Sequence, residues 1–279
     1  MKYCVLYNPK SGDNTNLREK IENAMFGGEF YYMSMPEVTD FRQFFAQVKD
    51  NIIICGGDGT LNYFINNIAG IPHNNHIFYF DSGSGNDFHT DVRGGERPYA
   101  IDIYLENLPI VRVNGHNHYV LNGCGCGIDS FACFEGEKKR QKTHKPINYT
   151  SMVVKGVLGS FKPFRARITV DGIAQDYNNV WLAPVMNGRF FGGGVEIAPM
   201  QNRLQNDTIT IVIGCANNRL KAAKLLSSVT KGGHIKNEKN FKFIHGKHFK
   251  VELSRPMELQ VDGEIIRDVS SFEVFTTKR

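Results

Sequence analysis

Residues 51–65 read NIIICGGDGTLNYFI, and this stretch indicates how the N-terminal part of the chain folds. Its opening apolar run is typical of a strand buried in a parallel sheet, and the spacing of Leu61 and Phe64 predicts a helix after the glycines. Open parallel sheets bind ligands at such strand-to-helix turns, and N–H groups at the start of a helix attract anions. The stretch therefore predicts a phosphate-binding turn.

The one carboxylate in this turn, Asp58, would repel a phosphate group. A divalent cation between the two would remove that repulsion, so the turn is typical of a site for magnesium-bound nucleotide. The alternative is that Asp58 only caps the helix that begins near Thr60, since aspartate is a common capping residue.

The flanking sequence continues the same alternation of strand and helix. The segments KYCVLYNP, YYMSM and HIFYF have the composition of strands, and residues 15–26 and 40–50 have helical spacing of apolar positions. This alternation, which runs to about residue 90, predicts an α/β domain with an open parallel sheet and helices on both faces.

From about residue 99 the pattern changes to apolar–polar alternation broken by Gly, Asn and Asp turns, as in RARITVDGIAQDYNNVW and HFKVELSRPMELQVDGE. Such runs predict an antiparallel β-sandwich or flattened barrel. We therefore expect two domains, 1–98 and 99–279, with the last strand free to return to the first domain.

Composition limits the classes of partner. Among 279 residues, 33 Lys and Arg against 28 Asp and Glu give a net charge of +5, too small for bulk nucleic-acid binding but compatible with an anionic substrate or membrane surface. No segment has the ~18 apolar residues of a spanning helix, and the first residues do not resemble a signal peptide. We expect a cytoplasmic protein.

Two further polar turns follow strands of the predicted parallel sheet. NPKSG ends the first strand, and DSGSGNDF follows the strand HIFYF. The carboxyl ends of parallel strands lie at one edge of a sheet, so these turns and GGDGT should form one nucleotide cleft.

These motifs, in this order and spacing, resemble the diacylglycerol kinase catalytic-domain family, which includes bacterial lipid kinases and sphingosine kinases. NPKSG, GGDGTLN and GSGNDFH are similar to its nucleotide motifs, and NGCGCGIDSFA, NGRFFGGGVEIAP and QVDGE to its later motifs. The resemblance spans residues 8–264 and implies transfer of the γ-phosphoryl group of ATP, with Mg²⁺, to a hydroxyl of a membrane lipid such as diacylglycerol.

The resemblance also implies roles for particular residues. The nucleotide-binding positions are Asn8, Pro9, Lys10, Ser11, Gly12, Gly57, Asp58, Gly59, Thr60, Leu61, Asn62, Ser84, Asn86 and Asp87. Asp58 and Asp207 match magnesium positions. Glu264 matches the proton acceptor, Asp262 belongs to the same late motif, and Asp129 matches an acidic position near the lipid headgroup.

The residues themselves allow two interpretations of Asp262 and Glu264. If the strand continues through Gly263, both carboxylates point to one face and one of them can act as a general base. If Asp262 and Gly263 instead form a hairpin turn, Glu264 is a solvated surface residue.

The chain departs from the family pattern in several places. Tyr63 replaces a glutamate, Ser84 a threonine and His89 an alanine, and QNDTITI keeps only Asp207 of an acidic segment. These departures leave open a non-catalytic lipid-binding protein, and GGDGT also occurs in soluble kinases such as NAD kinase.

Lysine-rich segments at 138–145, 162–167 and 221–250 are either solvated surface or a face that docks on anionic lipid headgroups. In the second case Phe161, Phe164, Leu225 and Leu226 would supply apolar contacts. A homodimer is also compatible with the sequence, since an edge strand can pair across a two-fold axis.

Overall fold

The computed structural model describes residues 1–9, 15–25, 27–83, 85–92, 95, 97–142, 148–204 and 207–277. Contacts divide the chain into unit 1, Met1–Asn107, and unit 2, Leu108–Arg279. This division lies beyond the boundary near residue 98 expected from the sequence, because the short strand Tyr99–Ala100 pairs with the first sheet.

Unit 1 contains a five-stranded sheet with the order β2-β1-β3-β4-β5. Its strands are β1 (Lys2–Tyr7), β2 (Glu29–Ser34), β3 (Asn51–Gly56), β4 (Ile77–Asp81) and β5 (Tyr99–Ala100). The first four run parallel and β5 is antiparallel to β4. Side chains of β3 are buried on both faces, which explains its continuous apolar sequence.

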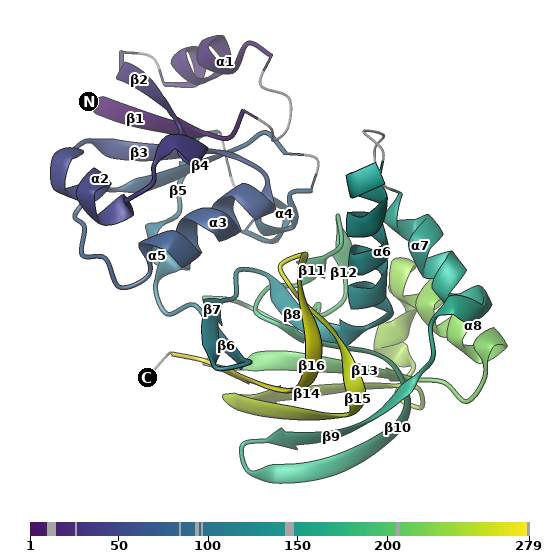
Figure 1. The fold of residues 1–279 in the computed structure, drawn as a ribbon. Helices are drawn as coiled ribbons and strands as arrows, with labels where there is room; N and C mark the ends of the chain where they lie inside the picture. Colours follow the sequence, from purple (N-terminus) through teal and green to yellow (C-terminus); the bar gives the residue numbers. More distant parts are fainter. Residues whose placement is uncertain are drawn as a thin grey trace. The chain divides into compact units, whose positions relative to one another are not determined.

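Helices cover both faces of this sheet, as Figure 1 shows for α1 and α3. They are α1 (Leu17–Ala24), α2 (Phe41–Gln47), α3 (Asp58–Ile68), α4 (Asp87–Val92) and α5 (Asp102–Leu105), with a 3₁₀ turn at Met35–Glu37. Ile21 of α1 packs with Val5 and Ile53 on one face. Phe41 of α2 stacks edge-on against Phe64 of α3. The predicted α/β architecture is confirmed.

Unit 2 is built on a nine-stranded antiparallel sheet. Its strands are β6 (Ile110–Val113), β7 (His116–Tyr119), β8 (Gly123–Gly127), β9 (Phe164–Val170), β10 (Ile173–Met186), β13 (Ile209–Cys215), β14 (Phe241–Gly246), β15 (His248–Val261) and β16 (Glu264–Phe275). Because β9 pairs with both β10 and β15, and β8 pairs with the same two strands, these four close into a small barrel. The predicted β-rich second domain is confirmed.

The last strand, β16, lies between β15 and β6, so it belongs to unit 2 and does not return to unit 1. A separate two-stranded hairpin is formed by β11 (Phe190–Phe191) and β12 (Val195–Glu196). The core of unit 2 is filled by apolar side chains such as Trp181, which is almost fully buried.

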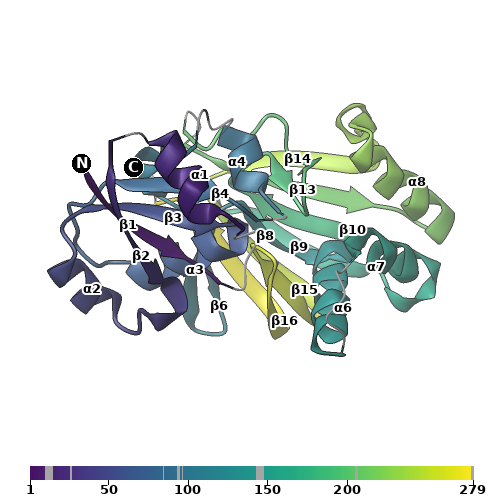
Figure 2. The ribbon, with the colours of Figure 1, turned by 90° about the horizontal axis from the view of Figure 1, so that it is seen from above.

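Three helices gather at one side of the unit 2 sheet, as Figures 1 and 2 show. They are α6 (Ile128–Lys142), α7 (Tyr149–Lys155), which continues as a π-helical turn at Gly156–Ser160, and α8 (Arg219–Thr230), which is followed by a 3₁₀ turn at Gly233–Lys236. Within the described residues, none of the helices is long and apolar enough to cross a bilayer.

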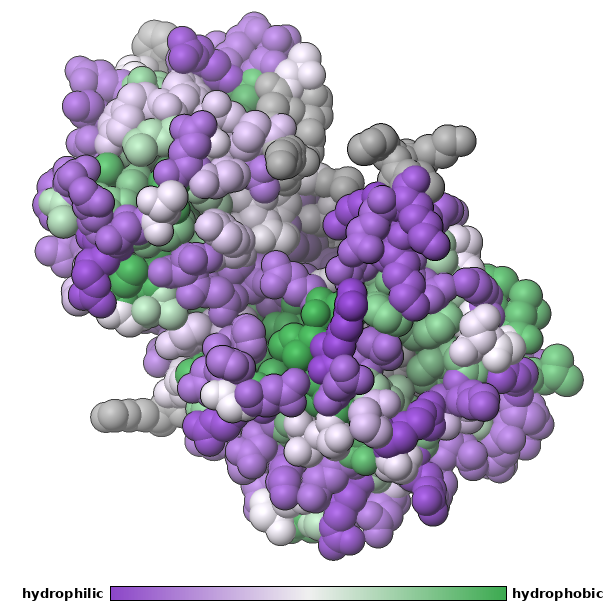
Figure 3. Space-filling model, in the orientation of Figure 1, coloured by the Kyte–Doolittle hydropathy of each residue, from purple (hydrophilic) through white to green (hydrophobic). Residues whose placement is uncertain are grey.

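The lysine-rich segments of unit 2 bury the apolar residues that the sequence suggested for membrane contact. Phe161, Phe164 and Leu225 are core residues, and Leu226 is partly buried against the same core. That part of the expectation is wrong, because the alternation of β9 directs Phe164 inward, Leu225 lies on the inner face of α8, and Phe161 packs on Trp181. Figure 3 shows that other apolar side chains reach the surface where Figure 1 places α7 and α8.

Candidate active site

The glycine turns after β3 and β4 are packed together backbone to backbone. The Ser82 amide donates to the Gly56 carbonyl at 3.0 Å, and the Asp58 amide donates to the Gly85 carbonyl at 3.2 Å. A Cβ atom added to Gly83 would lie only 2.3 Å from the Cα of Gly57. Glycine is therefore required at this contact. The two turns, residues 56–59 and the described residues of 82–86, pack as one piece at the carboxyl edge of the sheet, called here the glycine block.

The turn after β1 leaves the sheet at the same edge. Strands β1 and β3 are parallel, with Tyr7 opposite Cys55, so Asn8 and Pro9 follow at the end where Gly56 and Gly57 lie. The expectation that the polar turns share one edge is thus confirmed for their described parts. Lys10, Ser11, Gly12 and Ser84, expected from sequence to bind nucleotide, lie outside the described residues.

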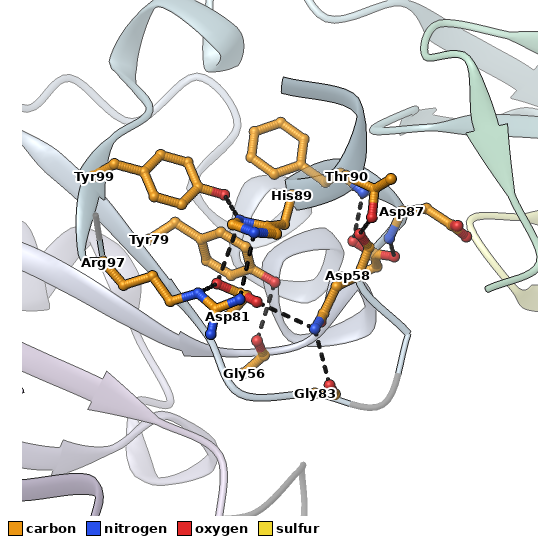
Figure 4. Close-up of polar contacts among 12 residues, drawn as sticks. Gly56, Asp58, Tyr79, Asp81, Gly83, Asp87, His89, Thr90, Arg97 and Tyr99 are labelled. Atoms are coloured by element: carbon orange, nitrogen blue, oxygen red, sulfur yellow. Dashed lines mark hydrogen bonds and ion pairs between the residues drawn. The ribbon is translucent and has the colours of Figure 1, made fainter. Parts of the chain in front are cut away.

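Asp58 caps a helix, but not the helix that it begins. Its Oδ2 accepts a hydrogen bond from the Asp87 amide at 2.7 Å, and its Oδ1 accepts one from the Phe88 amide at 3.1 Å (Figure 4). Both donors belong to the first turn of α4, whose N–H groups have no partner within the helix. Asp58 therefore fixes the position of α4 against the glycine block.

The carboxylates of Asp58 and Asp207 both have protein partners among the described residues. Both oxygens of Asp58 already accept backbone hydrogen bonds, and in unit 2 the exposed Asp207 carboxylate lies 3.7 Å from Lys247 Nζ. No cluster of three or more His, Cys, Asp or Glu side chains suited to a metal occurs among the residues that the structure describes. The magnesium roles implied for Asp58 and Asp207 therefore stay predictions from the sequence.

The remaining residues of the GGDGTLN motif differ in their accessibility. Thr60, Leu61 and Asn62 are buried, and Asn62 Oδ1 accepts a hydrogen bond from Asn66 Nδ2 at 2.7 Å. Gly59 is exposed, and a Cβ atom added to it would meet nothing within 4 Å. Only Gly59 and the half-buried Asp58 therefore offer open surface at the start of α3, and the side chain of Leu61 belongs to the core.

Asn86 and Asp87, also expected to bind nucleotide, mainly brace the second turn. Asn86 Nδ2 donates to the Gly83 carbonyl at 3.0 Å and to Asp81 Oδ2 at 3.3 Å. Asp87 is buried and begins α4, where its amide binds Asp58. These contacts hold the shape of the glycine block.

A charged cluster that sequence reasoning missed lies beside this block (Figure 4). The Asp81 side chain, 1% exposed, pairs with Arg97 Nε and lies 3.3 Å from His89 Nδ1, which is also 3.1 Å from the Tyr99 hydroxyl. Burial raises the pKa of Asp81, and the charges of His89 and Arg97 oppose that effect. The one signal of this cluster in the sequence was His89, which stands where the family has alanine. No sequence signal indicated a role for Arg97.

His89 and Arg97 also line a cavity of about 440 Å³, together with Ala24 and Gly95. Because the buried Asp81 carboxylate holds Arg97 in place, the cavity presents a fixed cationic guanidinium. Such a group suits a phosphate or another anionic part of a ligand.

In unit 2, Asp262 lies in a hairpin turn between β15 and β16. Asp262 and Gly263 both have positive φ angles, 48° and 88°, as a tight two-residue hairpin requires. The interpretation in which the strand continues through Gly263 is therefore wrong. Asp262 and Glu264 do not share one face of a continuous strand.

The Asp262 carboxylate is fully engaged by backbone amides. Its Oδ2 accepts from Leu121 at 2.7 Å, and its Oδ1 accepts from Asn122 at 2.7 Å and from Gly123 at 3.0 Å. Burial raises the pKa of Asp262 to about 6, although these hydrogen bonds act in the opposite direction. Asp262 therefore anchors the β15–β16 hairpin to the start of β8, and its catalytic role stays a prediction from the sequence.

The raised pKa of Asp262 predicts how stability changes with pH. The folded state binds a proton more tightly than the unfolded chain, so the contribution of Asp262 is fully present below about pH 4 and is lost as the pH rises through about 6. We expect the unfolding free energy of the wild type, relative to Asp262→Asn, to fall by about 2 kcal/mol between pH 4.5 and 7.5. Urea unfolding of both proteins measures this difference, and equal differences at both pH values would contradict it.

Glu264 and Asp129 lie in contrasting surroundings. Glu264, the first residue of β16, is exposed, and among the described residues its carboxylate has no hydrogen bond or ion pair. Asp129 lies in the first turn of α6, where Gln260 Nε2 donates to its Oδ2 at 3.3 Å. Its Oδ1 is buried without a hydrogen-bond partner among the described residues, and burial raises the pKa of Asp129. Asp129 Oδ1 therefore has unused acceptor capacity, and the surrounding protein atoms cover it in this structure.

Comparison with known proteins agrees with this arrangement of two units. Residues 2–109 match the diacylglycerol kinase catalytic domain, and residues 124–274, more than half of the chain, match the YegS C-terminal NAD kinase beta sandwich-like domain. The diacylglycerol kinase of Staphylococcus saprophyticus is 26% identical over 281 residues, which cover 93% of this chain and 88% of that protein. The diacylglycerol kinase of Staphylococcus aureus strain JH9 is 25% identical, covering 93% and 85%.

A crystal structure of a diacylglycerol kinase from Bacillus anthracis has the same fold, with a TM-score of 0.68. It is 20% identical, and the match covers 99% of this chain and 93% of that one. The sequence motifs, the two-unit fold and the matched domains lead to one conclusion: the chain belongs to the diacylglycerol kinase catalytic-domain family.

Proposed function

We propose that this chain is an ATP-dependent lipid kinase, which transfers the γ-phosphoryl group of ATP to a hydroxyl of a membrane lipid such as diacylglycerol. The observation that carries the proposal is the glycine block of unit 1, in which two turns are locked together at the carboxyl edge of a parallel sheet. In a chain of this kinase family, that edge is where a nucleotide would bind.

The described residues fit ATP. Gly59 leaves open space at the start of α3, where backbone N–H groups and the helix dipole favour a phosphate group. The cavity lined by His89 and Arg97 adds the cationic guanidinium of Arg97 in the same unit. ATP supplies the phosphoryl group when it is bound, and magnesium enters as the counter-ion of this substrate.

Glu264 is the side chain best suited to accept the proton of the lipid hydroxyl. Its carboxylate is exposed, and its neighbour Asp262 already uses its oxygens to bind three amides. Asp129 is the second acidic residue of this proposal: binding a donor of the lipid headgroup requires a local movement that exposes its buried Oδ1. General-base assistance of this kind contributes about 10²- to 10⁴-fold to rate.

Tyr63, which stands where the family has glutamate, lies on the outer side of α3. Tyr63 lies on α3 with 41% of its surface exposed, and its ring packs against Phe41 of α2. The substitution at this position therefore leaves the contacts between Asp58 and α4 in place.

A second candidate is a kinase for a soluble acceptor such as NAD, because the match over unit 2 is to a domain described as NAD kinase-like. The relatives that match 93% of the chain are diacylglycerol kinases, which favours the lipid.

A panel of acceptors separates these two functions. The purified protein is incubated with magnesium and γ-labelled ATP in the presence of diacylglycerol vesicles, phosphatidylglycerol vesicles, a sphingoid base, NAD or a sugar phosphate. We expect label in one lipid class and none in NAD or the sugar phosphate. Label in NAD alone would overturn the lipid proposal in favour of the soluble acceptor.

A further inference from the structure

We infer that unit 2 docks on an anionic lipid bilayer through a patch formed by Val154, Leu158 and Leu220, called here the α7–α8 patch. The inference rests on the proposed function for its choice of partner, since a lipid acceptor must be reached in a bilayer. It differs from the sequence expectation, whose apolar contact residues are mostly in the core.

The α7–α8 patch consists of three large apolar side chains that are exposed on the surface of unit 2. Leu158 and Leu220 are 78% and 79% exposed, and Val154 is 51% exposed. Figure 3 shows apolar side chains gathered at the surface where α7 and α8 lie in Figure 1. Clustered exposed apolar residues mark an interaction site more often than single ones do.

Arg219 links the turn that carries Leu158 to the start of α8, which carries Leu220. Its Nη1 donates to the carbonyls of Gly156 and Val157 at 3.2 and 2.8 Å, and its Nη2 donates to those of Gly159 and Phe161 at 3.3 and 3.0 Å. These four bonds fix the turn that carries Leu158 against the start of α8, where Leu220 follows Arg219. Leu158 and Leu220 therefore lie on two segments that the hydrogen bonds of Arg219 hold together.

The surroundings of the patch are cationic. Residues 148–170 and 217–237, which include α7 and α8, contain no Asp or Glu, and their exposed lysines include Lys155, Lys162, Lys221, Lys224 and Lys231. The nearby acid of α6, Glu135, is paired with Lys138 and Lys155. Apolar side chains among lysines match a bilayer surface with anionic headgroups, where each nearby cation adds to binding.

Vesicle sedimentation without nucleotide tests the inference independently of kinase activity. The wild type should bind vesicles that contain phosphatidylglycerol, bind phosphatidylcholine vesicles much less, and lose binding at high salt. The double variant Leu158→Ser/Leu220→Ser should bind the anionic vesicles about tenfold or more weakly, because two apolar side chains no longer insert. Lys221→Gln/Lys224→Gln should weaken binding and reduce its dependence on salt.

Ile173→Ser is the matched control. Ile173 lies in the β9–β10 hairpin of the same unit and is 78% exposed, so its replacement removes about as much apolar area as one of the two leucines, away from the patch. It should leave vesicle binding unchanged, and the melting temperatures of all variants should match the wild type. Wild-type binding by the double variant, or an equal loss in the Ile173 variant, would overturn the inference.

Two further readouts distinguish bilayer docking from self-association and from lipid phosphorylation. If the patch joins two copies of the chain instead, the double variant would change the mass in solution without changing vesicle binding, and the inference would be wrong. Phosphorylation of a short-chain, dissolved diacylglycerol should be equal in the wild type and the double variant. Absence of phosphorylation in both, with the expected vesicle binding, would reject the proposed function and support the docking surface.

Discussion

Glu264→Gln is expected to lower kcat for lipid phosphorylation by about 10²- to 10⁴-fold, because the amide cannot accept the proton of the attacking hydroxyl. Glu264 is exposed and begins β16 immediately after the Asp262–Gly263 turn, so glutamine should keep the hairpin intact. We therefore expect no change in melting temperature and little change in KM for ATP.

The measurement is steady-state phosphorylation of diacylglycerol, with thermal unfolding of the same samples. Glu238→Gln is a suitable control, since Glu238 is an exposed glutamate of the same unit outside the candidate site. If Glu264→Gln keeps wild-type kcat, Glu264 is not the proton acceptor, and phosphoryl transfer depends on positioning alone.

Asp58→Ala is expected to lower kcat/KM for ATP by about 10²-fold and the unfolding free energy by about 1–2 kcal/mol. The loss of stability follows because two amides of α4 lose their acceptor. The loss of activity follows because α4 and the glycine block then lose the contact that fixes them at the edge where ATP is proposed to bind.

Asp40→Ala distinguishes a local effect on the site from loss of stability alone. Asp40 caps α2 of the same unit through a 3.0 Å hydrogen bond from the Gln43 amide, outside the glycine turns. We expect a similar loss of stability without loss of activity. Equal activity losses in the two variants would show that Asp58 has no special part in the nucleotide site.

The elements of the fold could be predicted because their signals are local. The apolar run of β3 and the spacing of Leu61 and Phe64 in α3 depend on neighbours within a few residues. The shared edge of the polar turns could also be predicted, since it follows from parallel pairing of the strands that carry them.

The roles of the two aspartates could not be predicted in this way. Asp58 binds amides 29 and 30 residues away, and Asp262 binds amides 139 to 141 residues away. Both are acceptors for backbone groups brought close by tertiary folding, and a motif that contains an aspartate does not reveal such partners. The same holds for Arg97, whose contact with Asp81 depends on how β4 and the following loop are placed.

The exposed apolar residues of unit 2 show the same limit. The sequence placed Phe161 and Leu225 beside lysines, but burial depends on which face of the element meets the core. The exposure of Leu158 depends on the turn that Arg219 holds.

The most direct test of lipid-kinase activity is transfer of label from ATP to diacylglycerol in vesicles, with ATP labelled in the γ position in one sample and in the α position in another. We predict label in the extracted lipid from γ-labelled ATP and none from α-labelled ATP. Nucleotide binding without label in any lipid, under conditions where the protein is folded, would contradict the claim that this chain is a lipid kinase.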